Sequence, residues 1–417
     1  MSLFDRFISR AIKNGTLTVT THDGVTTSYG KTTEGFPDIA IRLADSRVAR
    51  DVALKPELGA GEAYMDHRLQ VQDDDIMGLL ELVRLNTQWE QEGGIDDASI
   101  ISRLYGRIAG KIDRLNWTAR SKANVAHHYD LSDTLYDLFL DSDRQYSCAY
   151  FTDPANSLEQ AQADKKAHIA AKLALNPGQR VLDIGSGWGG MALYLHEVAG
   201  VDVTGITLSE EQLRYARDAA KSKGVADHVR FELVDYRDVQ GTYDRIVSVG
   251  MFEHVGPPNY RKFFGRCRDL LTPDGVMLLH SIGRFSGPGT SDRWSSKYIF
   301  PGGYSPALSE ILAASEQTVL MLTDMETLRL HYALTLRHWY ARVMAARAEI
   351  VALYDERFFR MWQFYLAGAT SAFEHGAQCV YQMQFTRQRR TLPITRDYIA
   401  VEETRLLELS AANVRSG

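Results

Sequence analysis

The clearest chemical signature in this sequence is a glycine-rich loop at residues 181–190, which reads Val-Leu-Asp-Ile-Gly-Ser-Gly-Trp-Gly-Gly. The loop follows an apolar run typical of a buried strand and precedes a helical pattern. Glycines let the backbone turn tightly and approach a ligand, and the start of a helix offers unpaired N–H groups. The pattern therefore predicts a binding loop for a nucleotide or nucleoside.

The class of ligand follows from the acidic residues around this loop. Gly185, Gly187 and Gly190 satisfy the G-x-G-x-x-G pattern of dinucleotide-binding folds. The acid expected about 20 residues further on is absent, because the next predicted strand ends in Gly-Ile-Thr-Leu-Ser at residues 205–209. Asp183 instead precedes the first glycine by two residues, which suits a cationic ligand without phosphate. We expect S-adenosylmethionine, and an NAD oxidoreductase is the alternative.

A second group of polar residues follows the strands of the same region. Glu253 and His254 come just after an apolar strand, and His280 ends the next one. Ligands bind outside the carboxyl ends of strands in open α/β sheets. A glutamate and a histidine can jointly hydrogen-bond a small oxyanion if one of them is protonated. A helix cap is the alternative role for Glu253, and we expect His254 to be structural.

The elements that position these residues alternate regularly. Strands are predicted at residues 181–184, 201–206, 229–234, 244–249 and 276–281, with helices at 191–199, 210–223 and 259–271 between them. This alternation predicts an α/β fold with a doubly wound, mostly parallel sheet. Residues 284–305 interrupt it with several glycines and prolines, as a lid insertion would. The remaining residues are helix-rich, with a closing strand at 380–385.

Residues 1–115 form a second, smaller predicted domain of α+β type. Two β-rich runs flank an Asp-Gly turn at residues 23–24, a strand is expected at 39–43, and a helix at 74–86. No catalytic constellation is visible in this part, so we expect it to support assembly or membrane docking. Residues 116–417 are then the catalytic domain.

Composition limits the class of protein further. The 417 residues are 45% apolar and 24% charged, with a net charge of −6, which argues against general nucleic-acid binding. The three cysteines are far apart, so neither a disulfide framework nor a zinc site is expected. We expect no metal, and a cytoplasmic location with reduced thiols. No run of about 20 apolar residues is present to span a membrane.

An ordered set of motifs resembles the cyclopropane fatty acid synthase family, which includes the mycolic acid cyclopropane synthases. The resemblance covers roughly residues 120–400, and residues 61–66 resemble part of the extra domain of the phospholipid-acting members. The motifs are His-Tyr-Asp at 128–130, Tyr-Ser-Cys-Ala-Tyr-Phe at 146–151, the strand end at 205–209, Phe-Glu-His at 252–254, His-Ser-Ile at 280–282, Tyr-Ile-Phe-Pro-Gly-Gly at 298–303 and His-Tyr-Ala-x-Thr-Leu at 331–336.

The resemblance implies roles for individual residues. It implies that S-adenosylmethionine is held by Tyr146, Gly185, Gly187, Thr207, Leu208 and Gln212, with Tyr236 and Arg237 at the adenine. The last pair departs from the mycolic acid enzymes, which have Trp-Glu there. It implies that a bicarbonate ion is bound by Cys148, Glu253, His280, the backbone of Ile282 and Tyr332. Cys148 is expected to donate a weak hydrogen bond and not to act as a nucleophile.

The activity implied is transfer of a methylene group to the cis double bond of an unsaturated phospholipid acyl chain. The resulting carbocation would lose a proton to bicarbonate and close to a cyclopropane ring. The protein is expected to be a homodimer at the inner face of the membrane, docked on anionic lipid through residues 358–366 or the arginines at 387–390. The alternatives are a related lipid methyltransferase with a methyl- or methylene-branched product, and a non-enzymatic lipid-binding protein.

Overall fold

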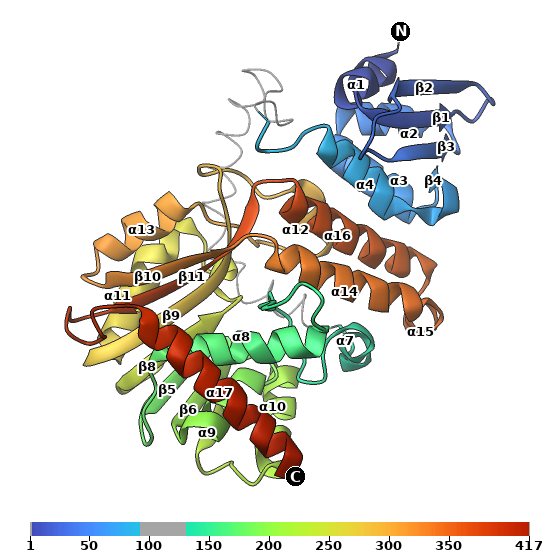
Figure 1. Ribbon diagram of the computed structural model, residues 1–417. Helices are drawn as coiled ribbons and strands as arrows, with labels where there is room; N and C mark the ends of the chain where they lie inside the picture. The colour runs from blue at the N-terminus through green and yellow to red at the C-terminus, as the bar shows by residue number, and fades with distance from the viewer. Residues whose placement is uncertain (1, 92–130, 417) are drawn as a thin grey trace. The chain divides into compact units, whose positions relative to one another are not determined.

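The computed structural model describes residues 2–91 and 131–416, with side chains up to residue 409 (Figure 1). The predicted domain boundary near residue 115 and the motif at 128–130 lie outside the described residues. The chain divides into two compact units. The first takes in Met1–Ile112, Thr290–Pro301 and Ala333–Gln378, and the second takes in Asp113–Gly289, Gly302–Tyr332 and Cys379–Gly417. The first unit thus includes two segments from the second half of the sequence.

The first unit is built on a four-stranded sheet with the order β2-β1-β3-β4. Its N-terminal elements are α1 (Leu3–Ala11), β1 (Gly15–Thr20), β2 (Thr26–Lys31), β3 (Asp38–Leu43), α2 (Ser46–Leu54), α3 (Pro56–Met65), β4 (Leu69–Val71) and α4 (Ile76–Leu85). The later helices are α12 (Arg293–Tyr298), α14 (His331–Ala345), α15 (Arg347–Leu353) and α16 (Glu356–Glu374). β1 and β2 pair as the hairpin that the Asp-Gly turn predicts.

Helix α16 belongs to the core of this unit. Arg360 lies with its guanidinium carbon 4.0 Å from the ring centroid of Tyr64 in α3, and its Nε donates to the Tyr64 carbonyl at 2.7 Å. Gln363 accepts a hydrogen bond from the Tyr64 hydroxyl at 2.7 Å. The expectation that residues 358–366 dock on a membrane is therefore wrong, because most of the side chains in that run are buried in the protein.

The second unit contains a seven-stranded sheet with the order β10-β11-β9-β8-β5-β6-β7 (Figure 1). The strands are β5 (Arg180–Ile184), β6 (Asp202–Thr207), β7 (Val229–Leu233), β8 (Tyr243–Val249), β9 (Leu271–Arg284), β10 (Met321–Leu328) and β11 (Gln378–Thr386). Neighbouring strands among β5 to β9 run parallel, and β10 pairs antiparallel with β11. The predicted doubly wound, mostly parallel sheet is confirmed.

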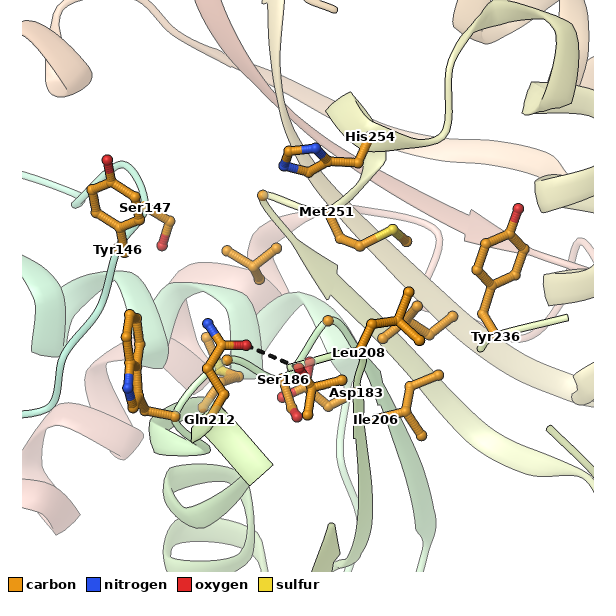
Figure 2. A pocket seen from close by; sticks show the side chains of 18 of the residues that line it. Tyr146, Ser147, Asp183, Ser186, Ile206, Leu208, Gln212, Tyr236, Met251 and His254 are labelled. Carbon is orange, nitrogen blue, oxygen red and sulfur yellow. Dashed lines mark hydrogen bonds between the residues drawn. The ribbon is translucent and has the colours of Figure 1, made fainter. Parts of the chain in front are cut away.

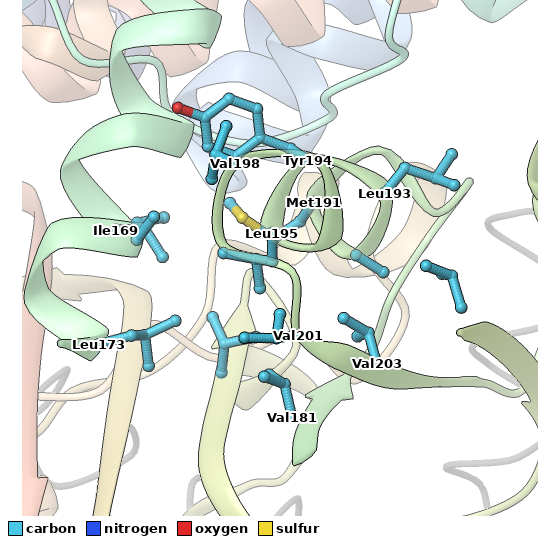
Figure 3. Packing of buried hydrophobic residues seen from close by; sticks show 14 of the residues in the cluster. Ile169, Leu173, Val181, Met191, Leu193, Tyr194, Leu195, Val198, Val201 and Val203 are labelled. Atoms are coloured by element: carbon cyan, nitrogen blue, oxygen red, sulfur yellow. The ribbon is translucent and has the colours of Figure 1, made fainter. Parts of the chain in front are cut away.

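Helices cover both faces of this sheet. The helices of this unit are α7 (Asp133–Phe139), α8 (Leu158–Leu173), α9 (Gly190–Ala199), α10 (Glu210–Ser222), α11 (Tyr260–Leu270), α13 (Leu308–Glu316) and α17 (Asp397–Ser416). Apolar side chains of α8 and α9, such as Ile169 and Leu195, pack on Val181 and Val203 of the strands (Figure 3). A second cluster joins α11 and α13 to the other face. Among the described residues, no helix is both long and apolar enough to cross a membrane.

Candidate active site

A pocket lies at the carboxyl ends of β5, β6, β7 and β8, where the order of strands reverses on either side of β5 (Figure 2). A crevice at such a reversal is the usual ligand site of a doubly wound sheet. The fold brings together in its lining all the residues predicted to hold the cofactor, which are Tyr146, Asp183, Gly185, Gly187, Thr207, Leu208, Gln212, Tyr236 and Arg237.

The backbone of the glycine loop adopts conformations that would be strained in any residue with a side chain. Gly185 has φ +83° and Gly187 has φ +54°. A Cβ atom at Gly185 would lie 2.7 Å from the Cβ of Met251, so the loop has no room for a side chain there. At Gly187 a Cβ would meet no protein atom within 4 Å. The backbone at Gly187 therefore faces open space in the pocket, where a ligand can approach it closely.

Two oxygen atoms in the pocket lining are buried without a hydrogen-bond partner among the described residues. They are Oδ2 of Asp183, at the end of β5, and Oγ of Ser186 in the loop. Burial raises the pKa of Asp183 to about 7, while the positive charge of Lys165 acts in the opposite direction. Orphaned buried polar atoms are costly unless a ligand satisfies them. The pocket is thus complementary to a ligand that carries hydrogen-bond donors or positive charge.

Gln212 is oriented by its neighbours. The Thr207 hydroxyl donates to Oε1 of Gln212 at 2.9 Å, which leaves the amide nitrogen directed into the pocket (Figure 2). Ser209 caps α10 by accepting from the backbone N–H of Gln212 at 3.3 Å. This cap fixes the first turn of the helix against the end of β6. The side-chain amide of Gln212 is consequently a preoriented donor for a ligand.

Tyr236 and Arg237 follow β7 and contribute differently. The Tyr236 ring packs edge-on against Phe263, with 5.3 Å between ring centroids, and forms a wall of the pocket. The guanidinium of Arg237 makes two hydrogen bonds to the Asp235 carboxylate, at 2.6 and 2.8 Å. Arg237 is therefore held by Asp235, and the ring of Tyr236 is the flat apolar surface suited to an adenine.

The pocket also contains residues that the sequence did not single out as ligand contacts. Met251 and His254, on either side of Glu253, both line it, as do Trp188, Gln145 and Ser147. Burial lowers the pKa of His254 to about 4, so this imidazole is neutral. The sequence predicts a structural role for His254, and the structure places it in the pocket wall. Its place directly after Glu253 was the available signal that it faces the same site.

Lys165 of α8 lies beneath the pocket and is fully buried. Its Nζ donates to Oε1 of Gln145 at 2.8 Å and to Oγ of Ser147 at 2.9 Å, and both acceptors line the pocket. Burial lowers the pKa of Lys165 to about 8, and Asp141 opposes that shift. Helical spacing places Lys165 seven residues after the buried Leu158, on the apolar stripe of α8, so the sequence did contain a signal for it.

Glu253 and Ile282, two of the residues predicted to bind an anion, are in direct contact. The backbone N–H of Ile282 in β9 donates to Oε1 of Glu253 at 2.6 Å. Oε2 of Glu253 is buried, and within the described ranges no side chain or backbone group is found in hydrogen-bond geometry with it. Burial raises the pKa of Glu253 to about 7. A protonated Glu253 could therefore donate from Oε2 to an anion, which a carboxylate could not do.

His280 lies two residues before Ile282 on β9 and is also buried. Its Nδ1 lies 3.2 Å from Nε2 of Gln382 in β11. Burial, together with the positive charges of Lys165, Lys172 and His168, lowers the pKa of His280 well below its usual value. The imidazole is therefore neutral and can present one N–H donor.

Cys148 and Tyr332 are buried in the same unit, on two other segments. The Cys148 thiol donates to the Ala149 carbonyl at 3.3 Å. Three residues later, the N–H of Phe151 donates to Nδ1 of His331 at 3.0 Å, which ties the residue before Tyr332 to the segment that carries Cys148. These contacts bring the two segments together, and Glu253 is joined to Ile282 beyond the end of β8.

Comparison with known proteins places this fold and pocket in a family. The family model described as mycolic acid cyclopropane synthetase matches residues 117–383. The chain belongs to the mycolic acid cyclopropane synthetase family. It is 38% identical over 348 residues to a cyclopropane-fatty-acyl-phospholipid synthase of Escherichia coli, which covers 83% of this chain and 87% of that protein.

Two further comparisons bear on the chemistry. The chain is 42% identical over 285 residues to a probable fatty acid methyltransferase of Pseudomonas putida, covering 66% of this chain and 72% of the relative. The crystal structure of mycolic acid cyclopropane synthase CmaA1 complexed with SAH and CTAB matches with a TM-score of 0.61 and 34% identity, covering 63% of this chain and 97% of that chain. The predicted S-adenosylmethionine-dependent methyltransferase is thereby confirmed, and the NAD oxidoreductase is wrong.

Proposed function

We propose that the protein transfers a methylene group from S-adenosylmethionine to the cis double bond of an unsaturated phospholipid acyl chain and forms a cyclopropane ring. The observation that carries this proposal is the position of Glu253. It stands between Met251 and His254, which line the cofactor pocket, and its buried Oε2 has no hydrogen-bond partner in the described part of the chain. A proton-handling group thus adjoins the methyl-donor pocket.

The residues of the pocket fit S-adenosylmethionine by their chemistry. The backbone at Gly185 and Gly187, the amide of Gln212 and the Asp183 carboxylate would hold the polar parts of the cofactor, and Tyr236 would pack on the adenine. The orphaned Oδ2 of Asp183 provides the acceptor that a cationic ligand requires. When bound, the cofactor supplies an electrophilic methyl group.

Deprotonation requires little basicity from the protein. An alkene that takes up the methyl group becomes a carbocation, and the protons of the new methyl are then very acidic. A weak acceptor held within about 3 Å suffices. Bicarbonate would supply that acceptor, held by Glu253, His280, the Ile282 backbone, Cys148 and Tyr332. Because the pKa of Glu253 is raised to about 7 and His280 is neutral, both side chains can donate to the anion.

The test is expression of the protein in a bacterium that lacks cyclopropane lipids, followed by fatty-acid methyl ester analysis. We expect a new ester heavier by one CH₂ group, with the high-field proton signals of a cyclopropane ring. Folded protein that yields no such ester in this bacterium would contradict the proposal.

A second candidate is a lipid methyltransferase that gives a methyl- or methylene-branched acyl chain from the same carbocation. The similarity to the Pseudomonas putida relative, a probable fatty acid methyltransferase, favours this candidate. A methylene-branched product has the same mass as the cyclopropane product, so mass alone does not separate them. Vinyl proton signals in place of ring proton signals would identify this second activity.

The proposal includes docking of a homodimer on anionic lipid at the inner face of the membrane. Arg389 and Arg390 are exposed in the loop between β11 and α17, and Ile394 in the same loop is fully exposed. Arg387 is held by the Leu271 carbonyl, and Arg396 pairs with Asp324 at 3.0 Å. Exposed cations beside an exposed apolar side chain suit a negatively charged bilayer surface. Sedimentation with vesicles tests the docking, and measurement of the oligomeric mass tests the homodimer.

A further inference from the structure

A buried chain of hydrogen bonds leads away from His280 through three neighbouring strands and α8. Nδ1 of His280 in β9 lies 3.2 Å from Nε2 of Gln382 in β11. Oε1 of Gln382 lies 2.8 Å from Nζ of Lys172 in α8. Lys172 also donates to Oε2 of Glu326 in β10, which is the register partner of Gln382. His168 then contacts the same Glu326 oxygen at 2.7 Å.

The donor and acceptor roles in this chain are fixed from its charged end. Glu326, whose pKa His168 and Lys172 lower to about 2, is a carboxylate 2.5 Å from Nζ of Lys172. Burial lowers the pKa of Lys172, and the negative charge of Glu326 opposes that shift and favours the ammonium form. An ammonium group has donors and no acceptor. The amide oxygen of Gln382 must therefore face Lys172, and its NH₂ group must face His280. The reversed amide would place its NH₂ group against the Lys172 ammonium, two donors facing each other at a side chain that is only 1% exposed.

The orientation of Gln382 decides which nitrogen of His280 carries the proton. Because Gln382 donates to Nδ1, that nitrogen must be an acceptor, and the neutral ring must carry its proton on Nε2. The opposite nitrogen of the ring is then a hydrogen-bond donor that points away from Gln382.

We propose that Gln382 and Lys172 are positioning residues that hold His280 as the neutral Nε2–H tautomer, so that it donates a hydrogen bond to the anion beside Glu253. This inference rests on the proposed function for the presence of that anion, but the tautomer itself does not depend on it. Neither Gln382 nor Lys172 touches the reacting atoms. Their role is to keep an acceptor lone pair of His280 from facing a negative charge.

The tautomer can be read directly in the wild-type protein by NMR with ¹⁵N-labelled histidine. His280 is assigned by loss of its signals in a His280→Asn variant. We expect a protonated Nε2 and an unprotonated Nδ1, with or without bicarbonate. A proton on Nδ1, or a charged ring at neutral pH, would overturn the inference whatever the anion does. If the Nε2–H tautomer is found but added bicarbonate leaves turnover unchanged, the positioning role stands and the anion in the proposed function fails.

The variant Gln382→Glu tests the role in turnover. Its carboxylate would accept from both Lys172 and His280, so a neutral His280 would move its proton to Nδ1. At lower pH the ring would become charged and regain the Nε2–H donor. The positive charges of Lys165, Lys172 and His168 on α8 oppose this protonation, and Glu253 is the carboxyl group near the ring. We expect turnover of this variant to fall as the pH rises through the new imidazole pKa, with at least a tenfold loss of kcat/KM for bicarbonate above it. Affinity for S-adenosylmethionine should stay within twofold.

The matched control is Gln384→Glu, at a buried glutamine two residues along the same strand. Gln384 donates to the Lys172 carbonyl and to the Tyr398 hydroxyl at 2.6 Å, and not to His280. A new pH dependence in Gln382→Glu alone supports the positioning role. The same dependence in both variants, or in neither, contradicts it. If Gln382→Glu does not fold, the wild-type tautomer still decides the question.

Discussion

Replacement of Gly187 by valine is expected to separate cofactor binding from folding. Gly187 has φ +54°, and an added Cβ meets no protein atom within 4 Å. The cost to the fold is therefore the left-handed backbone strain of a residue with a Cβ, about 1–2 kcal/mol. The new side chain would project into the open space of the pocket and block the close approach of a ligand to the backbone. We expect affinity for S-adenosylmethionine to fall at least 100-fold, or about 2.7 kcal/mol.

Gly224→Val supplies the matched control for this prediction. Gly224 has φ +70°, an added Cβ there also meets no atom within 4 Å, and the residue lies outside the pocket. Both variants should lose a similar free energy of unfolding, measured by chemical denaturation. Only Gly187→Val should lose cofactor binding, measured by calorimetry with S-adenosylmethionine and S-adenosylhomocysteine. Normal cofactor affinity in Gly187→Val, or an equal loss in both variants, would refute this placement of the cofactor.

Three further predictions concern the anion group and the membrane. Glu253→Gln should lower turnover at least tenfold with little change in cofactor affinity. Because burial raises the pKa of Glu253 to about 7, its stabilising contribution is lost as the pH rises from about 4.5 to about 7, and the stability of the variant relative to wild type should rise over that range in denaturation at several pH values. Cys148→Ser should keep substantial activity, since a hydroxyl also donates a hydrogen bond, and turnover should require bicarbonate in degassed buffer. A dead serine variant with no bicarbonate dependence would return Cys148 to a direct chemical role. Vesicle binding should need anionic lipid, weaken as salt rises and weaken in Arg389→Glu/Arg390→Glu, because the Debye length is only about 8 Å at physiological ionic strength. Binding that ignores salt and lipid charge would show that Ile394 and other apolar groups dock alone.

The sheet around the pocket could be predicted because each of its central strands is a short apolar run bounded by turns. β5 to β8 begin and end within one residue of the predicted strands, and the predicted closing strand lies within β11. β10 was missed, since Met321–Leu328 contains Thr323, Asp324 and Glu326 among its apolar residues and most of its side chains are only partly buried. Such a strand has no clear period of two, and its pairing with β11 is a contact between residues far apart in the chain.

The membrane-docking prediction for helix α16 failed for a different reason. Its aromatic and basic residues have the composition of an interfacial segment, and composition alone does not say which surface they meet. The partner of this surface is α3, almost 300 residues earlier in the chain, where the guanidinium of Arg360 stacks on Tyr64. Because α12 and α16 pack in one unit with α3 and α4, removal of residues 1–115 would expose their buried side chains. A fragment of residues 116–417 is therefore a poor test of what the N-terminal residues contribute.

Helix α8 shows what the sequence could and could not reveal about the site. Ser157 caps its first turn by accepting from the Gln160 N–H at 3.2 Å, and a serine three residues before a glutamine is a cap that can be recognised in the sequence. Lys165 and Lys172 fall on its buried stripe, where an unpaired ammonium would cost several kcal/mol. Two buried lysines on one helix therefore require buried acceptors, but the sequence does not identify them. The structure supplies Gln145 and Ser147 for the first, and Gln382 and Glu326 for the second. Through these acceptors, one helix supports both the cofactor pocket and His280. Because Lys165 holds Gln145 and Ser147 of the pocket lining and Lys172 holds Gln382, calorimetry with S-adenosylmethionine should show a larger loss of affinity in Lys165→Met than in Lys172→Met.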